Sequence, residues 1–322
     1  MTRSGRYLAA AVIALVGIAS GTCGIYNSDL RRALSNVPAG IIAKIPGGSI
    51  EYAVKGAGVP LLSIHGAGGG YDQGLANVAD LVGEGFRVVA PSRFGYLRTP
   101  IPADASTAAQ ADAHAALLTE LKIPKTVVVG ISAGARSAME LAIRHPEKVS
   151  ALILIVPGTY SPASPVAIEK SRGSQFAFWL VNNGADFAWW AAEKIAPSLL
   201  IRFIGTPPGL VAASSPTEQV RVRTMVRNIQ PLSLRFAGIQ LDSNPEAKPP
   251  QFERIAAPTL VVSAQDDLFN TLPAAKYAAG KIAGARLVVY ETGGHLLVGR
   301  QSEVRKAIRD FLAESTRPGD PA

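Results

Sequence analysis

The stretch Gly130-Ile131-Ser132-Ala133-Gly134 constrains the fold of this chain more than any other. It follows Thr126–Val129, a short β-branched run that is typical of a buried strand. From Ala133 onward, apolar residues recur at helical spacing as far as the stop signal at Pro146. Glycines on both sides of the serine allow a tight backbone turn. The sequence therefore predicts a strand, a sharp turn that carries Ser132, and a helix.

The same alternation of short apolar runs and helical patterns extends over most of the chain. Because strands that alternate with helices form βαβ units, it predicts an α/β fold with a mostly parallel central sheet flanked by helices. Strands are expected at Gly48–Val54, Pro60–Ile64, Phe86–Ala90, Ala151–Val156, Thr259–Ser263 and Arg286–Tyr290, and helices at Leu75–Val82, Thr107–Leu121 and Glu303–Glu314.

The alternation stops between Pro157 and Pro258, where prolines separate helical patches that are rich in aromatic residues. Such an insertion late in a regular sheet predicts a helical cap. Its aromatic residues pack in the interior of the cap or line an apolar pocket. The expected division is a core of residues 45–158 and 251–314, a cap of residues 159–250 and a tail of residues 315–322.

The first 28 residues differ from the rest of the chain. After Arg3 and Arg6 no charge occurs until Asp29, and the dense apolar run Leu8–Ala19 has the length of a signal-peptide core. The whole uncharged stretch just reaches the ~20 residues that span a bilayer. We therefore expect residues 1–28 to be a membrane anchor or signal segment, residues 29–44 to be a polar helical connector, and the protein to be membrane-anchored or exported.

Composition narrows the possible partners. The apolar fraction of 48% and the charged fraction of 17% suit a globular chain with an ample core. The net charge is +8, but the Lys and Arg residues are scattered, which indicates a solvated basic surface and no nucleic-acid partner. Cys23 is the only cysteine, so an internal disulfide is impossible, and neither a structural zinc site nor a redox pair can be built from it.

A serine hydroxyl is a poor nucleophile unless a base takes its proton, and the four histidines of the chain are the candidate bases. His114 lies within a predicted helix and His145 ends one, which favours structural roles for both. His65 ends a strand and begins the glycine-rich stretch His65–Gly70. His295 follows the last predicted strand on a loop that could direct it toward Ser132, which makes it the candidate base.

The base needs an acid that orients the imidazole and stabilises its protonated form. Asp266 and Asp267 directly follow the strand Thr259–Ser263, whereas Gly158–Ala167, after the strand Ala151–Val156, contains no carboxylate. Asp267 is favoured because it lies further past the strand end, and Asp266 is the alternative.

A reaction that develops negative charge on a carbonyl oxygen also needs hydrogen-bond donors there. Backbone amides can serve, so small residues are sufficient at these positions. Ala133 follows Ser132, and Ala67 lies in the glycine-rich loop, so their amides are the expected pair. The same loop matches neither glycine pattern that cradles phosphate.

These motifs, in this order, resemble the α/β-hydrolase superfamily, in particular its capped branch of esterases and C–C bond hydrolases. The resemblance runs from about Ile45 to Phe311 and implies Ser132 as nucleophile, Asp267 as acid and His295 as base. The loop Pro91–Pro100 departs from the pattern Asp-x-x-G-x-G-x-S of many relatives, because Ser92 replaces the aspartate and Leu97 the second glycine.

The resemblance implies a serine hydrolase (EC 3.1.1) that cleaves a carboxylic ester or related acyl bond of a small hydrophobic substrate, with no metal or cofactor. Three alternatives stay open: a C–C bond hydrolase for ring-cleavage products, a cofactor-free perhydrolase, and a non-catalytic ligand-binding member of the fold. The first would need polar groups in the cap to bind a substrate carboxylate. The candidates are Arg202, Arg221, Arg223 and Arg227.

Overall fold

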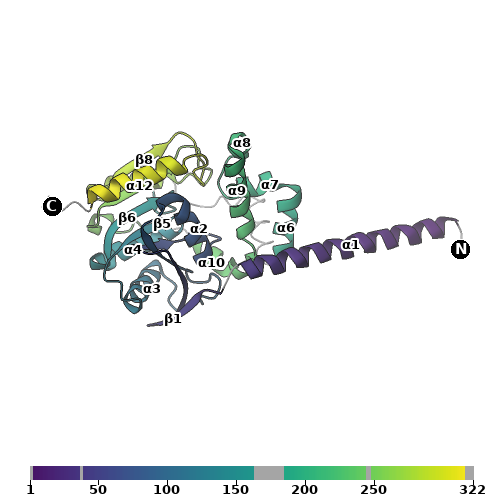
Figure 1. Ribbon diagram of the computed structural model, residues 1–322, viewed down its shortest axis with the longest axis horizontal. Coiled ribbons are helices and arrows are strands. Elements are labelled where there is room, and N and C mark those ends of the chain that lie inside the picture. The colour runs from purple at the N-terminus through teal and green to yellow at the C-terminus, as the bar shows by residue number, and fades with distance from the viewer. Residues whose placement is uncertain (1–2, 37–38, 163–184, 244–247, 316–322) are drawn as a thin grey trace.

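An eight-stranded, mostly parallel sheet forms the centre of the protein in the computed structural model (Figure 1). The structure describes residues 3–36, 39–162, 185–243 and 248–315. The strands are β1 (Ile41–Ile45), β2 (Gly48–Lys55), β3 (Val59–Ile64), β4 (Phe86–Pro91), β5 (Thr126–Ile131), β6 (Val149–Ile155), β7 (Thr259–Ala264) and β8 (Arg286–Tyr290). They lie in the order β1-β2-β4-β3-β5-β6-β7-β8, and only β2 runs antiparallel to its neighbours.

Helices cover both faces of the sheet because its central strands are apolar on both sides. Every residue of β5 and of β7 is buried. Within β5, Val128 belongs to the apolar cluster under α3 (Thr107–Glu120), α4 (Gly134–Arg144) and α11 (Leu272–Lys281). Its neighbours Val127 and Val129 belong to the cluster under α2 (Tyr71–Val82) and α12 (Gln301–Ser315). This two-sided burial is typical of parallel sheets.

Between β6 and β7 the described residues form helices that build a third apolar cluster. They are α6 (Asp186–Ile195), α7 (Pro197–Phe203), α8 (Pro208–Ala213), α9 (Pro216–Asn228) and α10 (Phe236–Asp242), with a 3-10 turn at Leu232–Leu234. Residues 163–184 and 244–247 of the predicted cap lie outside the described residues, as does the predicted tail beyond Ser315. The predicted parallel sheet with flanking helices and a late helical region is confirmed, whereas the domain boundaries stay a prediction.

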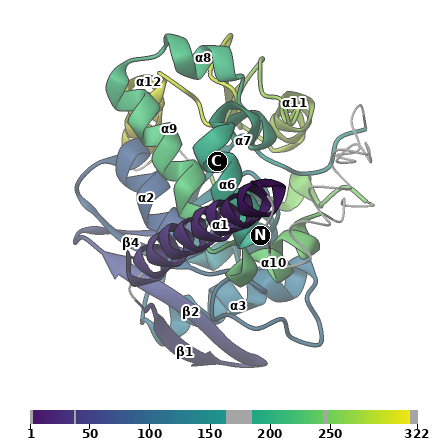
Figure 2. The ribbon, with the colours of Figure 1, turned by 90° about the vertical axis from the view of Figure 1, so that its right-hand side faces the viewer.

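Helix α1 (Arg3–Asn36) extends away from the rest of the protein and contacts it near its C-terminal end (Figures 1 and 2). The Tyr26 ring lies 5.6 Å from the Trp190 ring of α6, edge to face. The Asp29 carboxylate accepts a 3.0 Å hydrogen bond from the Trp190 indole and pairs with Lys194 at 3.2 Å. These contacts connect α1 to the helical region and not to the sheet.

One prediction for the N-terminal region is wrong, and the predicted helix of the connector is correct only as far as Asn36. The membrane-anchored or exported localisation is overturned because no helix among the described residues has both the length and the apolarity to cross a membrane. The dense apolar run Leu8–Ala19 makes only about 18 Å of helix, against a hydrocarbon core of about 30 Å. The predicted helical connector also differs, since α1 continues to Asn36 and Ile41 already begins β1, which pairs with β2.

Candidate active site

Ser132 lies at the turn between β5 and α4, as predicted. Its backbone φ is +51°, in the left-handed region, and its N–H donates to the Ile155 carbonyl at 2.9 Å. The flanking glycines are required by close approach: a Cβ at Gly130 would lie 2.5 Å from that of Ala138, and one at Gly134 would lie 2.4 Å from the His65 carbonyl oxygen. The turn therefore holds the serine in a strained conformation above the sheet edge.

The three residues predicted to act together form one hydrogen-bonded chain. His295 Nε2 lies 2.9 Å from Ser132 Oγ, and His295 Nδ1 lies 2.9 Å from Asp267 Oδ2. The Asp267 carboxylate is fully buried, and the His295 side chain is 8% exposed. With Nδ1–H donating to Asp267, Nε2 is left as an acceptor for the serine proton.

The neighbouring aspartates have different contacts, which bears on the choice between them. Besides His295, Asp267 accepts hydrogen bonds from the Thr271 hydroxyl and, at 2.9 Å, from the Phe269 amide. Burial opposes ionisation of Asp267, but the charge and hydrogen bonds of His295, with those of Thr271 and Phe269, lower its pKa overall. Asp266 instead accepts from the Gly294 amide at 2.7 Å. Asp267 thus contacts the side chain of His295, whereas Asp266 binds the backbone of the loop that carries His295.

The two predicted oxyanion donors line the same cavity as the serine, and a Cβ on Gly66, next to Ala67, would lie 3.1 Å from that of Ser132. Ala133 precedes α4, where backbone N–H groups have no partner within the helix. Among the described residues, neither the Ala133 nor the Ala67 amide donates to a protein acceptor. Gly158, which sequence analysis missed, keeps the space beside Ala133 open, because a Cβ there would lie 3.4 Å from the Ala133 nitrogen.

Four of the five predicted site residues, all but Asp267, line one cavity of about 260 Å³. The cavity lies between the carboxyl ends of the strands and the helical region. Its walls are mainly apolar, with Trp189, Phe203, Ile204, Met225, Ile229, Leu232, Ile239, Phe269 and Leu296 among the lining residues. Of the four arginines predicted for a substrate carboxylate, only Arg221 lines it, and Arg221 is paired with Glu218 at 2.7 Å.

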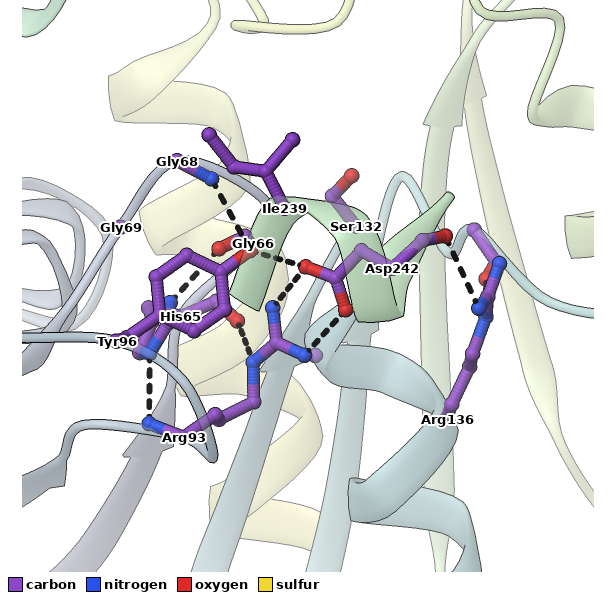
Figure 3. Close-up of polar contacts among 12 residues, drawn as sticks. His65, Gly66, Gly68, Gly69, Arg93, Tyr96, Ser132, Arg136, Ile239 and Asp242 are labelled. Carbon is purple, nitrogen blue, oxygen red and sulfur yellow. Dashed lines mark hydrogen bonds and ion pairs between the residues drawn. The ribbon is translucent and has the colours of Figure 1, made fainter. Parts of the chain in front are cut away.

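A buried polar network lies beneath the glycine-rich loop, and sequence analysis missed it (Figure 3). Arg93 donates two hydrogen bonds to the Asp242 carboxylate, at 2.7 and 2.6 Å, and the Tyr96 hydroxyl donates to the same carboxylate. The Arg93 amide donates to His65 Nε2 at 3.0 Å, so the His65 Nδ1–H donates to the Gly66 carbonyl at 2.7 Å. Burial, with the charge of Arg93, holds the pKa of His65 well below its usual value, so His65 is a neutral structural group.

The loop that departs from the family pattern forms part of this network. Leu97 adopts the left-handed backbone that glycine favours, with φ +51°, and its amide donates to the Leu234 carbonyl at 2.7 Å. Ser92, in place of the aspartate, donates to the buried Glu51 carboxylate at 3.3 Å. The turn therefore forms without the second glycine, and Glu51 supplies a carboxylate from β2.

No group of three or more His, Cys, Asp or Glu side chains within the described ranges is arranged to hold a metal ion. The imidazole that contacts the serine, that of His295, is itself bonded to the Asp267 carboxylate.

Comparisons with known proteins agree with this fold. A sequence model described as alpha/beta hydrolase fold matches residues 59–299. Uncharacterized hydrolase YcgS of Bacillus subtilis is 26% identical over 83% of this chain and 95% of its own, and 2-hydroxymuconate semialdehyde hydrolase of a Pseudomonas species is 27% identical over 81% and 89%. An alpha/beta hydrolase fold protein from Nakamurella multipartita has 28% identity and a TM-score of 0.67, covering 85% of this chain and 99% of its own. The chain belongs to the α/β-hydrolase family.

Proposed function

We propose that this protein is a serine hydrolase that cleaves the carboxylic ester bond of a small hydrophobic substrate through an acyl-enzyme on Ser132. The observation that carries the proposal is the hydrogen-bonded chain Ser132–His295–Asp267. Two backbone N–H groups of the same cavity, those of Ala67 and Ala133, donate to no acceptor among the described residues. This is the arrangement that acyl transfer requires: an activated nucleophile, an oriented base and oxyanion donors.

The reaction would proceed in two halves. Ser132 Oγ attacks the ester carbonyl carbon while His295 Nε2 takes its proton, and the Ala67 and Ala133 amides donate to the oxyanion. The tetrahedral intermediate collapses as His295 protonates the departing alcohol, which leaves the acyl group on Ser132. A water molecule then attacks the acyl carbon, gives its proton to His295, and releases the carboxylic acid with Ser132 regenerated.

The cavity supports a hydrophobic substrate. Its lining is dominated by apolar side chains, and the arginine from α9, Arg221, is neutralised by Glu218. Apolar walls with a few placed polar groups are typical of small-molecule sites, where the polar groups set the orientation. A volume of about 260 Å³ suits a short or medium acyl chain.

Covalent labelling tests the nucleophile. Wild-type protein is expected to be labelled by a fluorophosphonate probe, and Ser132→Ala is expected to lose that label. A matched control is Ser137→Ala, since Ser137 on α4 is buried, does not line the cavity and is not part of the triad. Labelling that persists in Ser132→Ala would refute the assignment.

Nitrophenyl esters of increasing acyl length test the substrate class. We expect kcat/KM to rise from acetate to a medium-length acyl chain and then to fall as the chain exceeds the cavity. An activity that is confined to charged substrates would contradict the ester proposal.

A second candidate, a C–C bond hydrolase, is favoured by the relatives. Besides the hydrolase of the Pseudomonas species, 2-hydroxy-6-oxo-6-phenylhexa-2,4-dienoate hydrolase of Comamonas testosteroni is 26% identical over 82% of this chain. The same triad could serve such a substrate. Turnover of a ring-cleavage dienoate at a higher kcat/KM than that of any nitrophenyl ester would favour this candidate.

A further inference from the structure

The Ala67 N–H has no acceptor among the described residues, but the Gly66–Ala67 peptide that carries it and the two residues that follow are held by other contacts. On one side, the Gly66 carbonyl accepts from His65 Nδ1–H at 2.7 Å. On the other side, the Gly68 amide donates to the Tyr96 hydroxyl at 3.4 Å, and the Gly69 carbonyl accepts from Arg235 at 2.6 Å. The peptide that carries the Ala67 N–H is therefore bound through its carbonyl, Gly68 and Gly69 are bound after it, and the N–H itself remains available for a ligand.

Two of these three anchors lead to a single cap helix, α10. Arg235 directly precedes α10, is fully buried, and is paired with Asp72 at 2.6 Å. Asp242 is the last residue of α10 and accepts the hydroxyl of Tyr96, the group that in turn accepts from Gly68. The two ends of α10 therefore hold two successive residues of the loop that carries the Ala67 amide.

Helix α10 is also seated directly on the loop that carries Tyr96. The Gly238 amide donates to the Gly95 carbonyl at 2.9 Å, and a Cβ on Gly238 would lie only 2.2 Å from the Tyr96 ring. Ile239 and Asp242, on the same short helix, line the substrate cavity. Figure 3 shows the Asp242 carboxylate pointing toward Tyr96 and Arg93, with Ile239 on the same helix. Helix α10 therefore contacts both the substrate cavity and Tyr96, the residue that binds the glycine-rich loop.

We propose that α10 sets the position of the Ala67 oxyanion donor through the chain Asp242–Tyr96–Gly68, with Arg235 on Gly69 as a second anchor. Tyr96 and Asp242 are then positioning residues for the reaction, although neither bonds to Ser132 or His295. Through Tyr96 and Asp242, the position of α10 affects kcat as well as the binding of the substrate. This inference rests on the proposed ester hydrolysis, because it concerns the donor of that reaction.

Tyr96→Phe removes the hydroxyl that joins the cap to Gly68 and leaves the two Arg93–Asp242 hydrogen bonds in place. Tyr71→Phe is the matched control: Tyr71 is a buried tyrosine just after the same loop, and its hydroxyl has no hydrogen-bond partner among the described residues. Rates are measured with a nitrophenyl ester and divided by the concentration of serine titrated to completion with a phosphonate, which discounts any unfolded fraction.

Complete loss of one oxyanion donor costs about 10²–10³ in kcat, so a displaced donor should cost less than that. We expect Tyr96→Phe to lower kcat by about 10- to 100-fold with KM changed less than about threefold, and Tyr71→Phe to match the wild type. The Ki of a trifluoromethyl ketone, whose adduct places an oxyanion in the same position, should rise by the factor by which kcat/KM falls. A merely structural loss would not produce that correspondence.

A second variant keeps the test independent of one substitution. Asp242→Asn should also lower kcat at least about tenfold, since it weakens the acceptor for Tyr96 at the end of α10. Its control, Glu193→Gln, weakens a different cap ion pair, the one with Arg227 at 2.9 Å, and should leave kcat unchanged.

The outcomes separate the two proposals. If Ser132→Ala hydrolyses the ester as fast as the wild type, the proposed function fails. If the activity depends on Ser132 and Tyr96→Phe nevertheless equals Tyr71→Phe in kcat and in Ki, the positioning role of α10 is overturned and the proposed function stands.

Discussion

Replacing Asp267 with asparagine keeps the shape of the side chain but removes its charge beside His295. The Nδ1–Oδ2 distance is 2.9 Å, and the carboxylate is fully buried. At an effective dielectric constant of about 20, an ion pair at this separation is worth about 5.7 kcal/mol, which corresponds to a factor of about 10⁴ in rate if the imidazolium forms in the transition state. An amide N–H directed at Nδ1 would also favour the tautomer in which Nε2 cannot accept the serine proton. We therefore expect kcat to fall by about 10⁴.

Asp266→Asn is the control that the chain itself offers. Among the residues that the structure describes, Asp266 accepts only the Gly294 amide. An asparagine oxygen can still accept that bond, so kcat should change by less than about tenfold. The assay is steady-state hydrolysis of one nitrophenyl ester by the wild type and both variants. A larger loss in Asp266→Asn than in Asp267→Asn would refute the assignment of the acid.

Three other perturbations test the surrounding structure. The pKa of buried His114 is lowered to about 3, so the folded state stays neutral while the unfolded chain takes up a proton below pH 6.5 and stability is lost as pH falls. When the pH is lowered from 6.5 to 5, the unfolding free energy measured with urea should fall by about 2 kcal/mol less in His114→Gln than in the wild type or in Met139→Leu. Parallel pH dependences in the three proteins would exclude this role of His114. Gly238→Ala should lower both the Tm and kcat, because its Cβ would overlap the Tyr96 ring, and unchanged values would contradict the packing. Arg235→Met should cost about 3–5 kcal/mol in unfolding free energy by leaving Asp72 unpaired, and a loss below about 1 kcal/mol would argue against that pair.

Local patterns predicted the sheet and the positions of the contacting triad. Ser132 could be found because a strand, two glycines and a helix surround it, and His295 because it follows a strand in a glycine turn. The choice between Asp266 and Asp267 is harder to predict because they are adjacent on one loop. A shift of one position along the chain determines which carboxylate contacts the imidazole and which accepts the Gly294 amide.

The polar network beneath the glycine loop could not be predicted in the same way. Tyr96 and Asp242 are 146 residues apart, and no periodicity relates a tyrosine in a loop to the last residue of a short cap helix. Leu97 adopts a backbone conformation that usually indicates glycine, so the residue type does not reveal the conformation of that turn. At the N-terminus, the uncharged stretch reaches the length of a membrane span but its dense apolar part does not, so the predicted localisation is wrong.

The position of the cap in the chain has a consequence for synthesis on the ribosome. Strand β6 is apolar and is flanked in the finished sheet by β5 and β7, but β7 is encoded about a hundred residues later. At about 5–20 residues per second, the nascent chain holds an unpaired apolar edge for about 5–20 s. Such an edge is a template for pairing with other chains, so the protein is exposed to aggregation while the residues between β6 and β7 are synthesised.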